Sequence, residues 1–291
     1  MRNVTIAVLI ALFPSFSSAQ STLAWKFKAG DAFIYERVAK DKQATNIKGQ
    51  TLKQEILSTW VYRFETLKSE SESATLQVTL DQVSVQHATG PGNLDNKLLE
   101  KMKGAVFSIT VSPRGEISAL VGYDKVVDQI ADKRDGLAKT IRQHFPEASI
   151  RHELQQIIVM LPKEPVAVGS RWQFEARPLP TPPVGEFLTT FHGALSSIDR
   201  AGHYHIDGIL TGKYERPDPP AEFFRIVGGN VTMEKGQSSC IFDNERGRVI
   251  SQQLTLEMKG ELTIEIVGAT TAAEVQLRRD VTTRLLPNPK E

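Results

Sequence analysis

The chain is poor in cysteine and has no excess of charge. Cys240 is the single cysteine in 291 residues, so no intramolecular disulfide can form and the core alone must stabilise the fold. The 35 Lys and Arg residues almost balance the 34 Asp and Glu residues, and no basic block stands out. This balance gives no electrostatic case for binding nucleic acid or an anionic membrane surface.

Long hydrophobic runs are missing after the first residues. Residues 1–19 contain one cation, then an apolar run, then Ser17-Ser18-Ala19, a pattern typical of a signal peptide cleaved between Ala19 and Gln20. The residue directly after this site is Gln20 and not a cysteine, so a lipoprotein anchor is not indicated. No later segment approaches the roughly 20 apolar residues of a membrane helix. We therefore expect a secreted or periplasmic protein without a membrane span in the mature chain.

Catalytic motifs are also absent from the sequence. It contains no Gly-x-Ser-x-Gly elbow, no His-Glu-x-x-His pair, no phosphate loop and no dinucleotide fingerprint. Cys240 precedes Ile241 and Phe242, which favours packing over reactivity. We expect no cofactor and no enzymatic activity, although a site assembled from distant residues would escape this search.

Three histidines form the one pattern that suggests a metal site. His203 and His205 are two positions apart on an expected strand, so both imidazoles point the same way. His192 lies on the facing strand of the same expected hairpin, and three imidazoles could hold zinc. The interpretation that we favour is that all three are polar residues on a solvated strand face.

One stretch, residues 121–161, carries the long helical pattern of the chain. Its apolar residues recur at three- and four-residue spacing, which predicts two or three amphipathic helices. Each stripe needs a protein surface to cover it. The members expected to line a ligand cavity beneath the helices are Tyr123, Val127, Ile130, Leu154, Ile157 and Ile158.

The remaining segments alternate apolar and polar residues, as strands with one buried face do. We expect short strands at 25–27 and 33–35 around a tight turn, and separate strands at 253–258 and 261–267. Residues 29–35 and 168–174 align glycine on glycine and aromatic on aromatic, and Arg114-Gly115 and Arg246-Gly247 fall in matching turns. Two similar halves, about 23–120 and 165–286, are therefore predicted. The alternative is a chance likeness between antiparallel meanders.

These patterns predict an α+β fold. Residues 20–291 would form a single domain in which the helices of 121–161 join the halves and pack on one mostly antiparallel, curved β-sheet.

Several of these residues carry a resemblance to known proteins. Leu161-Pro162, Pro165-Val166, Gly169 and Trp172 follow an amphipathic helix, and Trp25-Lys26-Phe27 precedes Gly30-Asp31. In this the chain resembles an uncharacterised family of secreted bacterial proteins of unknown function. Its expected plan is more remotely similar to the curved half-barrel of periplasmic lipoprotein carriers. Neither resemblance supplies catalytic residues.

Three functional hypotheses follow. The first is a non-enzymatic protein that binds an apolar ligand or lipid between the sheet and the helices. The alternative is an interaction or structural module of the cell envelope, which would use loops such as the one containing Phe223-Phe224. The least favoured is a metal-dependent hydrolase around His203 and His205. The sequence identifies neither the ligand nor a partner protein.

Overall fold

The computed structural model describes residues 20–89, 101–181, 185–216, 225–266 and 268–287. The predicted signal peptide and Phe223-Phe224 lie outside these ranges. The described strands are β1 (Ala32–Ile47), β2 (Gln50–Ser69), β3 (Ala74–Thr89), β4 (Val106–Val111), β5 (Ile117–Val121), β6 (Arg171–Thr181), β7 (Gly185–Ile198), β8 (His203–Glu215), β9 (Arg225–Asp243), β10 (Arg248–Ile266) and β11 (Ala269–Leu286). Between β5 and β6 lie the helices α2 (Tyr123–Ala131), α3 (Asp135–His144) and α4 (Glu147–Ile157).

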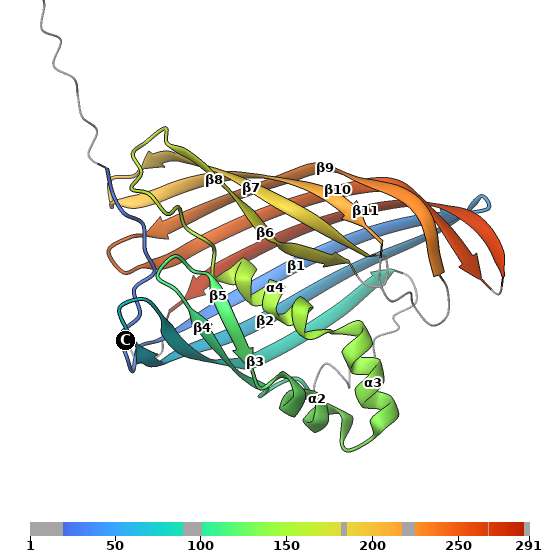
Figure 1. The fold of residues 1–291 in the computed structure, drawn as a ribbon, viewed down its shortest axis with the longest axis horizontal. Helices are drawn as coiled ribbons and strands as arrows, with labels where there is room; N and C mark the ends of the chain where they lie inside the picture. Colours follow the sequence, from blue (N-terminus) through green and yellow to red (C-terminus); the bar gives the residue numbers. More distant parts are fainter. Residues whose placement is uncertain (1–19, 90–100, 182–184, 217–224, 267, 288–291) are drawn as a thin grey trace, which may run out of the picture.

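The strands form a single antiparallel sheet in the order β5-β4-β3-β2-β1-β11-β10-β9-β8-β7-β6. The first and last strands lie together in the middle of the sheet, because β1 pairs with β2 on one side and with β11 on the other. Figure 1 shows that the sheet curves strongly, so that β6 and α4 stand in front of β1. The mostly antiparallel, curved sheet predicted from the sequence is thereby confirmed. The division into two similar halves stays a prediction.

Alternation along each strand gives the sheet one buried face. On β1, Phe33, Tyr35, Arg37 and Ala39 are buried, while Ile34, Glu36 and Val38 are more exposed, because successive side chains point to opposite faces. Phe33 stacks on Phe64 of β2 with ring centroids 5.1 Å apart. The Tyr35 hydroxyl donates to the Val249 carbonyl oxygen at 2.8 Å. The concave face therefore carries the core.

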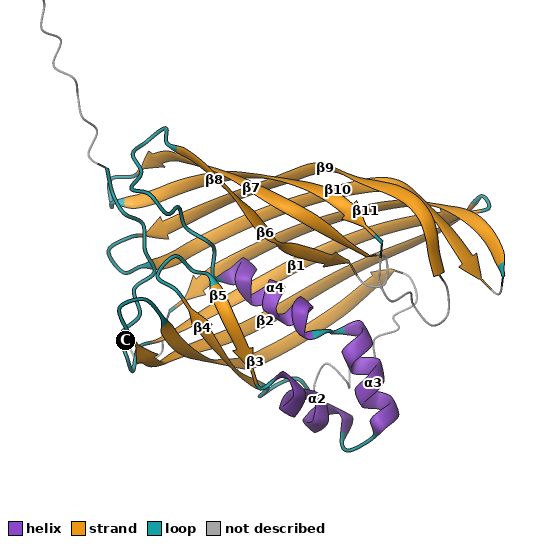
Figure 2. Ribbon diagram, in the orientation of Figure 1, coloured by secondary structure: helices purple, strands orange, loops and turns teal. Residues whose placement is uncertain are grey.

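Helix α4 bridges the two open edges of this sheet. It contacts the edge strands β5 and β6, and Figure 2 shows it lying between them. Its apolar side is fully packed, since Leu154 and Ile157 are at most 1% exposed. Unpaired edges invite association with other strands, and α4 covers this gap. Within the described part of the chain, no helix is long and apolar enough to cross a membrane.

The predicted strand at 25–27 is wrong. The chain there is extended but outside the sheet, because its backbone and side-chain donors go to two hairpin turns and to the end of α4. The Trp25 amide donates to the Pro113 carbonyl at 2.8 Å and its indole N–H to the Val159 carbonyl at 2.9 Å. The Lys26 amide donates to the Gly247 carbonyl at 3.4 Å. This segment therefore ties the β4–β5 and β9–β10 turns together.

Separate strands at 253–258 and 261–267 were also predicted wrongly, because β10 runs unbroken from Arg248 to Ile266. Gly260 does not interrupt the strand. It pairs with Val231 on β9 and Val275 on β11, and a Cβ at this position would lie 2.1 Å from the Asn230 carbonyl oxygen. The glycine is therefore needed for close approach of the neighbouring backbone.

Gly115 in the β4–β5 turn should be far less tolerant of alanine than Gly30. Both have left-handed backbones, with φ of 84° and 87°, so alanine costs each about 1–2 kcal/mol. A Cβ at Gly115 would also lie 2.3 Å from the Val159 carbonyl oxygen, whereas nothing lies within 4 Å at Gly30. Crowding should add about 1–3 kcal/mol for Gly115→Ala. Urea unfolding of both variants measures the difference, and equal losses would contradict this packing.

Candidate functional site

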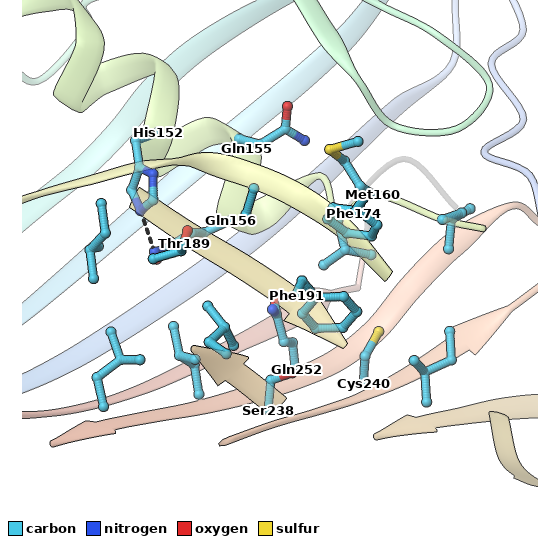
Figure 3. Close-up of a pocket in the computed structure, with 18 residues that line it drawn as sticks. His152, Gln155, Gln156, Met160, Phe174, Thr189, Phe191, Ser238, Cys240 and Gln252 are labelled. Carbon is cyan, nitrogen blue, oxygen red and sulfur yellow. Dashed lines mark hydrogen bonds between the residues drawn. The ribbon is translucent and has the colours of Figure 1, made fainter. Parts of the chain in front are cut away.

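A mostly apolar cavity of about 110 Å³ lies between the α4 segment and the concave face of the sheet. Figure 3 shows the side chains around it. The helix and the residues that follow it supply one wall, and strands β6 to β10 supply the other. The lining residues are His152, Gln155, Gln156, Val159, Met160, Leu161, Phe174, Ala176, Leu179, Thr189, Phe191, Ile206, Leu210, Ser238, Cys240, Gln252, Leu254 and Leu256.

Glycines on the strands help to keep this space open. Gly193 and Gly208 are register partners on β7 and β8. A Cβ at Gly208 would lie 2.3 Å from the Phe191 ring, and one at Gly193 would lie 2.5 Å from the Trp172 ring. Each ring therefore packs directly against the glycine backbone, in space that a side chain would otherwise occupy. Because the Phe191 ring lies close to the sheet, it does not fill the volume beneath α4.

The end of the cavity at His152 and Gln156 is polar, and the end at Phe174 and Cys240 is mostly apolar, with Gln252 opposite Cys240. In Figure 3, His152 and Gln156 lie together on one side, away from Phe174 and Cys240. The Gln156 Nε2 and His152 Nε2 atoms are 2.6 Å apart. At the other end the Phe174 and Phe191 rings stack with centroids 5.0 Å apart. Such a lining can hold an apolar chain and bind a polar group at one of its ends.

Behind the polar end lies a buried ion pair that joins α4 to the central strand. Arg37 of β1 is 2% exposed, and its Nη1 lies 2.6 Å from Glu153 Oε1. Its Nη2 donates to Gln156 Oε1. Burial raises the pKa of Tyr62 well above its usual value, and the nearby Glu153 carboxylate adds to this rise. A second pair lies on the same face of the sheet, where Arg279 donates to both carboxylate oxygens of Asp41 at 2.6 and 3.0 Å.

Removing Glu153 should destabilise the fold because it leaves the Arg37 charge buried and unpaired. Breaking a buried pair costs about 3–5 kcal/mol, and since Glu153 is partly exposed we expect about 2–3 kcal/mol for Glu153→Ala. The control is Asp124→Ala, whose partner Arg142 is 43% exposed, with an expected loss of at most about 1 kcal/mol. Urea unfolding measures both. Equal losses would show that Arg37 does not depend on α4.

Cys240 lies at the apolar end of the cavity as a packed thiol. It is 7% exposed, and burial raises its pKa to about 12. The thiolate, which is the nucleophilic form, is therefore scarce at neutral pH. This position suits apolar contact and not nucleophilic catalysis.

The same thiol should report whether α4 covers the cavity. Near pH 8 a free cysteine alkylates readily, but Cys240 in the folded protein should react with iodoacetamide at least about tenfold more slowly than in urea, given its raised pKa. Glu153→Ala should speed labelling by loosening α4, whereas Asp124→Ala should not. Mass spectrometry gives the rate without background, since no other cysteine exists. Rapid labelling of the folded wild type would contradict a covered cavity.

The structure brings two of the three predicted metal-site histidines together. His203 Nδ1 and His205 Nε2 lie 3.2 and 3.4 Å from Asp199 Oδ2. Hydrogen bonds to Asp199, first from the His203 amide, lower its pKa to about 2. His192 lies opposite Ile209 across the hairpin. Ile209 is four positions from His205 on β8, so His192 lies about 13 Å along the strand from His205. Among the described residues, no three His, Cys, Asp or Glu side chains are arranged to hold a metal ion.

The six residues predicted to line a ligand cavity fall into two groups. Tyr123, Val127 and Ile130 line a cavity of only about 20 Å³ between α2, α3 and β4. Leu154, Ile157 and Ile158 are at most 1% exposed and belong to the core. The larger cavity is instead bounded by the polar side of α4. Sequence reasoning missed this lining because polar residues of an amphipathic helix are expected to face water.

One family model matches part of the chain. Residues 58–191 match a family of unknown function (DUF6263), a stretch that begins in β2 and ends in β7. The predicted resemblance to an uncharacterised family is thereby confirmed. No curated protein matches the chain.

Several solved structures match the chain, and among them is one with a similar fold. It is a structure of lipovitellin, described as "Lipid-protein interactions in lipovitellin". The match has a TM-score of 0.53 and 12% sequence identity, and it covers 90% of this chain and 26% of that one. This chain thus spans about a quarter of that protein, and the likeness shows the fold alone. An outer membrane channel from Pseudomonas putida F1 covers 94% of this chain and 100% of its own, with 8% identity and a TM-score of 0.19. A DUF1329 family protein from Desulfovibrio piger covers 83% of each chain, with 7% identity and a TM-score of 0.13.

Proposed function

We propose that this chain is a secreted or periplasmic, non-enzymatic protein that binds the apolar chain of a lipid or a similar ligand between α4 and the concave face of the sheet. The observation that carries the proposal is the apolar cavity of about 110 Å³ beneath the segment that bridges both sheet edges. Burying apolar surface in such a space is favourable at about 25 cal/mol per Å². The runner-up function is an interaction module of the cell envelope.

The size of the cavity indicates how a ligand would enter. Pockets for small ligands typically measure about 300–1,000 Å³, and a dry cavity of about 150 Å³ can take up benzene. The space of about 110 Å³ therefore fits the end of an acyl chain but not the whole of it. A complete chain would require α4 to move away from β6. Much of the free energy needed to move α4 away from β6 is then the free energy of breaking the ion pair between Arg37 and Glu153.

The arrangement of the strands supports this placement of the site. Five strands lie on each side of β11. Read across the sheet in one direction, the order is β5 to β1 before β11 and β10 to β6 after it, so both sets run in descending order, as two similar halves would. The concave face of the first half is covered by α2 and by the packed side of α4. The second half carries the cavity. The proposal also draws support from lipovitellin, which is described by its lipid–protein interactions and has a similar fold.

The test uses protein of residues 20–291 exported by a bacterial host. Native mass spectrometry with solvent extraction detects a lipid that co-purifies, and the neutral fluorophore N-phenyl-1-naphthylamine measures binding directly. Ala176→Phe fills the cavity and should weaken fluorophore binding by roughly tenfold, given an overpacking cost of about 1–3 kcal/mol.

The matched control is Ala194→Phe, because Ala194 lies on the opposite face of β7 from Phe191 and Leu195. It should bind the fluorophore as the wild type does. A clean apo mass together with no fluorophore binding would overturn the proposal and favour the interaction module. Equal binding by both variants and the wild type would place the apolar site elsewhere.

A further inference from the structure

The side-chain amide of Gln156 is held between two groups that can bind a carboxylate. Its Oε1 accepts a hydrogen bond from Arg37 Nη2, and its Nε2 lies 2.6 Å from His152 Nε2. Arg37 is buried on the central strand, while His152 is one helical turn before Gln156. The amide thus closes the polar end of the cavity.

The Gln156 amide accepts from Arg37 and donates to His152 Nε2, and a carboxylate can replace it when His152 Nε2 carries a proton. The two groups are alike in size and are both planar, but a carboxylate accepts hydrogen bonds at both of its oxygens. Arg37 can only donate, and His152 donates from Nε2 when that nitrogen carries a proton. Among the described residues, the buried Nε of Arg37 also has no hydrogen-bond partner. Arginine binds carboxylates through two adjacent N–H groups, so a further donor is in place.

The charges around this position can accommodate one more anion. Arg37 is balanced by Glu153, and Arg279 is balanced by Asp41. Tyr62 stays neutral because burial raises its pKa. A ligand carboxylate would add one negative charge, which a protonated His152 would balance. A ligand without charge would gain nothing from that protonation.

We infer that the ligand is an amphiphile with one carboxylate head group and an acyl chain, that is, a fatty acid. The head group takes the place of the Gln156 amide between Arg37 and His152. The chain extends from there towards Phe174 and Cys240, and α4 moves away from β6 to admit it. This inference rests on the proposed function and specifies which apolar ligand the same cavity selects.

Competition between decanoate and decan-1-ol tests the head group, because the two differ only at that end. Each is used to displace N-phenyl-1-naphthylamine from the wild type, and decanoate should bind at least about tenfold more tightly, as charge-assisted hydrogen bonds imply. In His152→Leu the preference should fall to about one. The control His192→Leu removes an imidazole from an exposed position on β7 outside the cavity and should keep the preference.

Rescue of Gln156→Ala provides an independent test. This variant leaves Arg37 Nη2 without its acceptor and opens room for a head group. Its melting temperature should fall, and decanoate should restore it by several degrees more than it raises that of the wild type. Decan-1-ol should not do so. If the variant folds only in the presence of ligand, the yield on refolding with decanoate against decan-1-ol gives the same comparison.

The outcomes separate the two proposals. If neither compound displaces the fluorophore and the fluorophore itself does not bind, the proposed function fails. If both compounds bind equally to the wild type and His152→Leu changes nothing, the carboxylate inference is overturned while apolar binding stands. Equal rescue of Gln156→Ala by the alcohol would also overturn it.

Discussion

A buried charge on the central strand determines where α4 lies. Arg37 is on β1, and its register partners are Trp60 and Thr283, neither of which carries a charge. A guanidinium removed from water needs a partner, and here Glu153 and Gln156 of α4 supply it. Hydrophobic contact alone is non-directional and would let the helix slide over the concave face. The ion pair fixes it above β1, midway between the two sheet edges.

That position explains why one part of the concave face is filled and another is hollow. Leu154 and Ile157 pack into the core that includes Phe64 and Tyr35, so the apolar side of α4 contacts strands of the first part of the chain. Its other side faces β6 to β10, where Gly193 and Gly208 leave the aromatic rings lying low. A helix of ordinary width cannot fill both sides equally, and the cavity remains on the side of its polar residues.

The features predicted from the sequence are those set by local periodicity. The strands and the helices within 121–161 could be predicted because each buries one face, which gives its apolar residues a regular spacing in the sequence. The segment around Trp25 escaped prediction because its donors go to Pro113, Val159 and Gly247, which lie far away in the chain. The role of Arg37 escaped too, since a lone charge among Phe33, Tyr35 and Ala39 gives no indication of a helix that would pair with it.

The polar side of α4 shows why the cavity lining could not be read from the helical pattern. An amphipathic stripe assumes one protein face and one water face, but a helix that bridges two sheet edges has protein on both. His152, Gln155 and Gln156 therefore face a partly enclosed space, where a polar group without a partner is costly. Gln155 donates to the carbonyl oxygens of Gly115 and Ile158, whereas Gln156 bonds to both His152 and Arg37. The hydrogen-bonded group of Arg37, Gln156 and His152 thus lies at one end of a mostly apolar space, and this arrangement is the basis for proposing an amphiphile and not a plain hydrocarbon as the ligand.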